Sequence, residues 1–278
     1  MAKGIDVSQY QGRIDFTKVK SSEITFAYIR ATLGSGVIDS QFKRNWEAAR
    51  IVDLPRGAYH FLTRENAQVQ AKSYIATVGD VRRVDLKPML DVECQAALVT
   101  AATRKEYVHG ARIFIEEVES ATGRDVILYT GGPFFNALAA SADSSDVDFI
   151  TDRELWLAAY VTNPDKYVPK AWRDKGKSWV FHQLSGDVDA SGGPGARVNG
   201  ITTVVDMNTT QGVAADIIEW IGAPTMRLNI PPMDPTYVTS LDEILGMCED
   251  TTPEVDEGHQ HGMFGILHDV AHLMEEGD

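Results

Sequence analysis

The chain has 278 residues, of which 44% are hydrophobic and 24% are charged, a composition that suits one large globular domain with an appendage. Its 26 basic and 40 acidic side chains give a net charge of −14, which argues against a nucleic-acid partner held through phosphate contacts. No run approaches the roughly 20 apolar residues of a membrane helix, and the first residues lack a secretory pattern. We therefore expect no membrane insertion and no signal peptide.

Short apolar runs alternate with amphipathic stretches through residues 1–222, a pattern typical of a parallel sheet with helices between its strands. Eight strands are predicted, at Gly4–Val7, Ile24–Ile29, Gly57–Phe61, Leu86–Leu90, Val126–Tyr129, Leu155–Ala159, Trp179–Leu184 and Thr203–Val205. Helices are predicted at Gln41–Val52, Glu65–Val78, Thr103–Ser120, Pro133–Ala140 and Thr210–Ile221. Because little helix follows the sixth strand, we expect an α/β fold, an incomplete TIM-type barrel of the (β/α)5(β)3 kind with a short C-terminal helical appendage.

The C-terminal end of the chain differs in charge. Residues 223–278 hold twelve acids and a single base, a net charge of −11, whereas residues 1–222 carry only −3. Four prolines interrupt residues 223–237 and indicate a linker. We predict a catalytic barrel over 1–222, a Pro-rich linker over 223–237 and an acidic helical tail of unknown role over 238–278. We expect the apolar stripes of the tail to dock on the barrel, to pair between subunits or to engage another protein.

Acidic residues follow three of the predicted strands. Asp6 ends the first strand, Asp91 and Glu93 follow the fourth, and Asp206 follows the eighth. Because the chemistry of a parallel barrel gathers where strands end, these four acids are expected at one mouth. In Asp91-Val92-Glu93 both carboxyl groups point to one face, with Cα atoms about 6.5–7 Å apart.

Like charges at this spacing raise the pKa of at least one carboxyl group, which then stays protonated near neutral pH and can donate to a leaving oxygen. This indicates a glycosidase. The competing interpretation is that these acids cap helices or pair with nearby arginines. Five aromatic residues lie at or just beyond predicted strand ends, namely Tyr10, Tyr59, Tyr129, Trp156 and Tyr160. Their rings either provide flat stacking faces for sugars or belong to the hydrophobic core.

These segments, in this order, resemble glycoside hydrolase family 25, the Chalaropsis-type lysozymes common in bacteriophage endolysins. The resemblance spans residues 3–222 and rests on GIDVSQYQG (4–12), FAYIRATLG (26–34), RGAYHF (56–61), PMLDVE (88–93), ILYTG (127–131), LWLAAY (155–160), FHQLS (181–185) and VVDMN (204–208). One departure is Leu33, where the family often has an acid.

The resemblance implies hydrolysis of the β-1,4 bond between N-acetylmuramic acid and N-acetylglucosamine in peptidoglycan, without metal or organic cofactor. It implies that Glu93 is the general acid and that Asp6, Asp91 and Asp206 are the other acidic groups of the groove. Retention is preferred, with Asp91 or Asp206 stabilising the oxocarbenium-like centre, or with the substrate N-acetyl group as nucleophile. It also implies sugar contacts from Tyr59, Tyr129, Trp156, Tyr160, His182 and Gln183.

Two other chemistries are weighed and set aside. His268 and His272 have a spacing that can hold zinc, but no cysteine pair accompanies them, and a solvated role is simpler. Cys94 follows Glu93 directly, yet the next residue along a strand points away from the mouth.

The sequence therefore predicts a muramidase that acts as a phage endolysin or virion lysozyme. Such an enzyme would reach the wall from the host cytoplasm through a separate pore, or as part of the virion. The alternatives are a secreted antibacterial muramidase toxin, a chitinase-like hydrolase and a catalytically silent wall-binding module.

Overall fold

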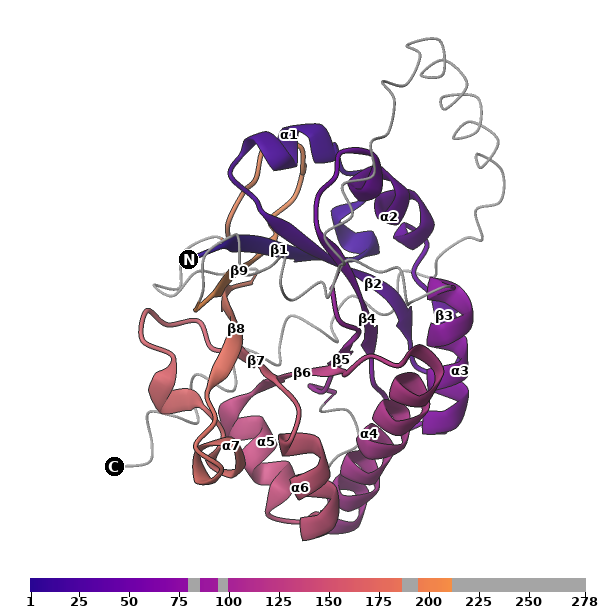
Figure 1. Ribbon diagram of the computed structural model, residues 1–278, viewed down its shortest axis with the longest axis vertical. Coiled ribbons are helices and arrows are strands. Elements are labelled where there is room, and N and C mark those ends of the chain that lie inside the picture. Colours follow the sequence, from indigo (N-terminus) through magenta and orange to yellow (C-terminus); the bar gives the residue numbers. More distant parts are fainter. Residues whose placement is uncertain (80–85, 95–99, 187–194, 212–278) are drawn as a thin grey trace. The chain divides into compact units, whose positions relative to one another are not determined.

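The computed structural model describes residues 1–79, 86–94, 100–186 and 195–211 (Figure 1). The strands are β1 (Lys3–Val7), β2 (Phe26–Leu33), β3 (Val37–Ile38), β4 (Arg56–Phe61), β5 (Met89–Asp91), β6 (Ile127–Gly131), β7 (Leu155–Ala158), β8 (Trp179–Ser185) and β9 (Asp206–Thr210). The helices are α1 (Phe16–Ser21), α2 (Phe42–Ile51), α3 (Ala67–Val78), α4 (Ala101–Thr122), α5 (Gly132–Ala139), α6 (Ser144–Thr151) and α7 (Lys170–Asp174). Two 3-10 turns, η1 (Gln9–Gln11) and η3 (Asp165–Tyr167), complete the described elements.

The strands form a closed barrel. Their order is β1-β9-β8-β7-β6-β5-β4-β2, and a further pairing of β1 with β2 closes the ring. Short β3 pairs only with the end of β2, as a hairpin. The fold class is thus a mixed α/β barrel of eight strands, as expected.

The last strand departs from the prediction in place and direction. We expected Thr203–Val205 to be a strand that Asp206 follows, but β9 begins at Asp206 and runs antiparallel to both β1 and β8. Val205, the residue just before β9, is buried in the hydrophobic core. The observed strand, DMNTT, has no apolar run, because its polar side chains help to line the barrel. The hydrophobic pattern therefore placed the predicted strand on the residues just before it.

Four of the predicted helices are confirmed as α2, α3, α4 and α5, whereas α1, α6 and α7 were not predicted. Local caps explain where α3 and α4 begin: the Asn66 side chain accepts from the Val69 amide, and Thr100 accepts from the Thr103 amide in a capping box. The predicted helix Thr210–Ile221 begins inside β9, and its residues from 212 onward lie outside the described residues.

Alternate side chains of each strand enter two different cores. One face packs against the helices, and the other fills the barrel with Phe26, Tyr28, Tyr59, Met89, Ile127, Tyr129, Trp156 and Phe181. Glycines make room for two of these rings: a Cβ on Gly4 would lie 2.2 Å from the Phe26 ring, and one on Gly57 would lie 2.3 Å from the Tyr28 ring. The lower barrel is therefore packed with rings, and chemistry is confined to the mouth.

Within the described residues, no helix is both long and apolar enough to cross a bilayer. The predicted linker 223–237 and tail 238–278, with His268 and His272, lie outside the described residues. Cys94 is half-buried beside the site, and its backbone amide donates to the Tyr107 hydroxyl at 3.3 Å.

Candidate active site

The four predicted acids lie at the same mouth of the barrel. Asp6 sits near the end of β1, Asp91 ends β5, and Glu93 follows two residues later. Asp206 reaches this mouth from the opposite direction, because the first residue of an antiparallel strand lies where its parallel neighbours end. Burial and nearby carboxyl groups raise the pKa values of Asp91 and Glu93, and the charge of Asp6 contributes to both shifts, so the groups are close together.

Two amide side chains hydrogen-bond to Asp6. Its Oδ2 accepts from Asn208 Nδ2 at 2.7 Å and from Gln183 Nε2 at 3.0 Å. The same Gln183 nitrogen lies 3.4 Å from Asp206 Oδ2. Burial raises the pKa of Asp6, and the bonds from Asn208 and Gln183 oppose that rise. These amides favour the charged form of Asp6.

Asp91 and Glu93 have the environment expected of proton-holding carboxyl groups. Asp91 is only 5% exposed, and its Oδ1 has no hydrogen-bond partner within the described part of the chain. Burial, then the charges of Glu93 and Asp6, hold the pKa of Asp91 well above its usual range, and Arg30 opposes this. Burial and the charge of Asp6 raise the pKa of half-buried Glu93 to about 7, while a hydrogen bond with Tyr129 lowers it. Glu93 can therefore hold a proton near neutral pH.

The Gln183 amide is oriented by two tyrosines. Its Oε1 accepts from the Tyr129 hydroxyl at 2.8 Å and from the Tyr160 hydroxyl at 3.1 Å. Because Oε1 accepts from tyrosine hydroxyls, the NH2 group faces Asp6 and Asp206, whose ionised carboxylates can only accept. The single hydroxyl proton of Tyr129 is shared between Gln183 Oε1 and Glu93, whose pKa it lowers. Tyr129, Tyr160 and Gln183 thus lie together beside the acids, and the sugar contacts expected of them stay a prediction.

Trp156 is placed differently from our prediction of a sugar-stacking face. It has no exposed surface, its ring lies 4.6 Å from that of Tyr28, and its Nε1 donates to Asn208 Oδ1 at 2.9 Å. It holds the amide that binds Asp6. Tyr59 is 8% exposed and is part of the same ring cluster, close enough to Arg30 and Asp6 for their charges to act on its hydroxyl. The sequence pattern located the strand ends but not the depth of each ring in the barrel.

His182 lies on the wrong face of β8 for the site. Its Nε2 donates to the Ala159 carbonyl, and its ring lies 5.5 Å from that of Trp179. Gln183, one residue later, points into the barrel, as alternation along a strand requires. The structure therefore places Gln183, and not His182, beside the acids.

Asn208 is a site residue that the prediction missed. It is fully buried and makes the shortest of the described hydrogen bonds to Asp6. Its position two residues after Asp206 could have revealed it, because residues i and i+2 of a strand share a face. This i, i+2 relationship was not recognised, because the last strand was predicted to end before Asp206.

A closed α/β barrel whose mouth gathers four carboxyl groups, one of them with a pKa raised to about 7, is the arrangement expected of a glycoside hydrolase. The chain belongs to the glycosyl hydrolases family 25, whose model matches residues 5–193, and it is therefore a glycosidase.

Three similar proteins extend this finding. The chain is 31% identical over 224 residues to lysozyme M1 of Streptomyces globisporus, which covers 78% of this chain and 70% of that protein. It is 32% identical over 223 residues to the uncharacterized protein YegX of Escherichia coli K12, covering 77% and 71%. The crystal structure of a bacterial lysozyme from Streptomyces coelicolor superposes with a TM-score of 0.65 at 28% identity, covering 79% of this chain and 96% of that one.

Proposed function

We propose that this protein is a peptidoglycan muramidase that hydrolyses the β-1,4 bond between N-acetylmuramic acid and N-acetylglucosamine. The observation that carries the proposal is Glu93, a half-buried carboxyl group at the barrel mouth whose pKa burial and Asp6 raise to about 7. Lysozyme M1, to which the chain is similar over most of its length, supports the choice of substrate.

In this mechanism Glu93 donates its proton to the departing glycosidic oxygen and, once ionised, recovers a proton from the attacking water. The leaving sugar departs as an alcohol, so no charge is left on its oxygen. Asp91 or Asp206 stabilises the oxocarbenium-like centre. Ionised Asp6, held by Asn208 and Gln183, keeps the pKa of Glu93 high through its charge.

We propose retention of configuration, through a carboxylate or through the N-acetyl group of muramic acid as the nucleophile. Retention by a protein nucleophile needs carboxyl groups about 5–5.5 Å apart, and inversion needs about 6.5–9.5 Å. Proton NMR of the anomer that is released first distinguishes retention from inversion. An initial α-anomer would exclude retention at this β-linkage.

The finer domain plan is likewise a proposal: a (β/α)5(β)3 barrel over 1–222, a linker over 223–237 and an acidic appendage over 238–278 available to a partner protein or a second copy. The charge contrast between residues 1–222 and 223–278 supports it. We also propose a role in phage-driven lysis, with the enzyme leaving the host cytoplasm through a separate pore or travelling in the virion. The resemblance to lysozymes common in endolysins supports this setting.

The deciding experiment is the release of soluble fragments from purified peptidoglycan by the full chain, with analysis of the new reducing ends. The expected product has muramic acid at the reducing end, and Glu93→Gln should release none while remaining folded. Glu106→Gln is the matched control, because Glu106 is an exposed glutamate on α4 that pairs with Arg64. It should keep full activity.

The same assay separates the alternatives. Glucosamine reducing ends, or turnover of chitin oligomers without turnover of peptidoglycan, would replace the muramidase proposal by a chitinase-like one. Binding to walls without any release, equal for the native chain and Glu93→Gln, would favour a silent binding module.

A further inference from the structure

Tyr10 is an exposed aromatic ring on the turn η1, directly after β1. Of the five aromatic residues predicted near strand ends, the structure buries Tyr59, Tyr129 and Trp156 and half-buries Tyr160. Tyr10 is 57% exposed, and it is the one aromatic ring among the large hydrophobic side chains that are exposed in the described part of the chain. Because a ring stacks on a ligand only where one of its faces is open, Tyr10 is the most accessible stacking surface of the five.

Arg30 links this ring to the mouth of the barrel. Arg30 follows Phe26 and Tyr28 along β2 at a spacing of two residues, so it shares their barrel-lining face at the end of the strand nearer the mouth. Its Cζ lies 5.3 Å from the centre of the Tyr10 ring. Burial raises the pKa of Asp91, and the charge of Arg30 opposes that rise, so Arg30 also lies close to the acids. The Tyr10 ring therefore stands at the rim of the mouth.

One buried carboxylate holds both the ring's turn and the guanidinium beside it. Asp39 Oδ2 accepts from Arg30 Nε at 2.9 Å and from the Gln9 amide at 2.8 Å. The side chains of Asp39 and Arg30 are both buried, so solvent and salt screen their ion pair little. Because the turn and the guanidinium share this oxygen, Tyr10 is held in place before any ligand arrives, and little conformational freedom is lost on binding.

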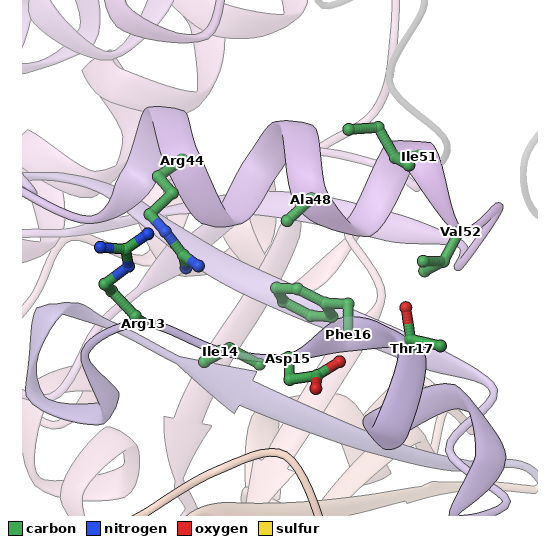
Figure 2. A pocket seen from close by; sticks show the side chains of 9 residues that line it. All are labelled: Arg13, Ile14, Asp15, Phe16, Thr17, Arg44, Ala48, Ile51 and Val52. Carbon is green, nitrogen blue, oxygen red and sulfur yellow. The ribbon is translucent and has the colours of Figure 1, made fainter. Parts of the chain in front are cut away.

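The turn is also anchored on both of its sides. Before it, the Ser8 amide donates to Gln11 Oε1 at 2.9 Å in a capping box. After it, Asn45 Nδ2 on α2 donates to the Gly12 carbonyl at 3.1 Å. Figure 2 shows the buried Phe16 ring beneath α2, where the segment that leaves the turn and the helix line one groove. The exposed ring is therefore carried by a fixed segment.

We propose that Tyr10 stacks on a sugar ring of the bound glycan strand, beside the sugars that flank the bond to be cleaved. This inference rests on the proposed function, because it takes the polymer in the mouth to be a glycan. The carbon-bound hydrogens on one face of a pyranose ring are weakly positive and the face of an aromatic ring is negative, so the two faces attract each other. Tyr10 contributes affinity for the strand and does not touch the reacting atoms.

Binding of glycan strands stripped of peptide tests this contact without turnover. We would titrate the full chain carrying Glu93→Gln, alone and with a second substitution, by calorimetry. Adding Tyr10→Leu should weaken binding about fivefold, which corresponds to about 1 kcal/mol. Tyr10→Phe and Tyr10→Trp should bind as the Glu93→Gln protein does, because both keep a flat ring.

Ile51→Ala is the matched control for loss of an exposed apolar side chain. Ile51 is 51% exposed and ends α2, which leads into the start of β4 at the end of the barrel opposite the mouth. It should bind glycan as the Glu93→Gln protein does. Unchanged binding by Tyr10→Leu would overturn the proposal, as would losses for Tyr10→Phe and Tyr10→Trp that equal the loss for Tyr10→Leu.

Hydrolysis by chains that keep Glu93 separates stacking from an effect on the acids. Tyr10→Leu should raise KM on purified peptidoglycan about fivefold and leave kcat and its pH profile unchanged. A shifted pH profile would overturn the proposal, because Tyr10 would then act through Arg30 on Asp91. If the native chain hydrolyses no wall but Tyr10→Leu still weakens glycan binding, the muramidase proposal fails and the stacking role stands. If hydrolysis proceeds and Tyr10→Leu changes neither binding nor KM, only the stacking role fails.

Discussion

Asp6 and Asp206 are direct register partners across the antiparallel β1–β9 pair, so two carboxyl groups face each other at the mouth of the barrel. A hydrogen bond with Asp206 opposes the rise in the pKa of Asp6 that burial causes. Gln183 Nε2 donates to both carboxyl groups, at 3.0 Å to Asp6 Oδ2 and at 3.4 Å to Asp206 Oδ2. This arrangement makes Gln183 a positioning residue and leads to the first prediction.

Replacing Gln183 with Leu should slow hydrolysis and shift its pH dependence. Loss of the donor raises the pKa of Asp6, so Asp6 is more often neutral and repels Glu93 less. The pKa of Glu93 then falls, and kcat/KM on purified peptidoglycan should begin to decline at a lower pH than in the native enzyme. A loss of rate with an unchanged pH profile would mean that Gln183 only fills space.

The neighbouring substitution His182→Gln is its matched control. His182 contacts the Ala159 carbonyl and Trp179 on the opposite face of β8. Its replacement should leave the pH profile of hydrolysis unchanged. If His182→Gln shifted the pH profile as much as Gln183→Leu does, the position of these side chains on opposite faces of β8 would not explain the role given to Gln183.

The native enzyme should lose activity as the pH rises through about 7, because Glu93 must be protonated to act as the acid and burial and Asp6 raise its pKa to that value. Tyr129→Phe removes a hydrogen bond that favours the charged form of Glu93, so the pKa should rise further and the decline should move to higher pH. A profile of kcat/KM between pH 5 and 9 measures both. Movement toward lower pH would contradict the role given to Tyr129.

Stability should decrease in acid because of His60. Burial lowers the pKa of this histidine to about 4, and its ring is neutral, with Nε2 donating to Gln70 Oε1 at 3.0 Å and Nδ1 accepting from Thr32 at 2.7 Å. The unfolded chain gains this proton below about pH 6.5, so the free energy of unfolding should fall by about 3 kcal/mol between there and pH 4.

Urea unfolding of the native chain and of His60→Gln across this pH range isolates that contribution. The variant should lose less stability on acidification by about that amount, although it is less stable at pH 7 because the ring packs against Phe114. Parallel curves for both proteins would assign the acid sensitivity to other groups.

Gly57→Ala should destabilise the barrel, because the added Cβ would lie 2.3 Å from the Tyr28 ring in a closely packed interior. We expect a loss of about 1–3 kcal/mol in the free energy of unfolding. Gly110→Ala is the control: its Cβ would meet only Ala67 Cβ at 3.6 Å on α4, and the helix should gain about 0.5–1 kcal/mol. Equal effects in thermal unfolding would show that the barrel accommodates the extra methyl group.

The sequence by itself determined that acids gather at one mouth of a barrel. Asp6, Asp91 and Glu93 directly end or follow apolar runs, and residues i and i+2 of an extended chain share a face, so their convergence follows from local periodicity. The apolar runs also placed all but the last of the eight predicted strands, because burial against helices requires continuous hydrophobic segments.

Only the tertiary structure decided the direction of β9, the depth of Trp156 and the separate roles of His182 and Gln183. A polar strand that lines a barrel leaves no hydrophobic pattern, and periodicity gives the face of a side chain but not its partners. The bonds that hold Asp6 join residues 177 and 202 positions apart in the chain. Such contacts depend on how distant strands meet when the barrel closes, which no local window of sequence contains.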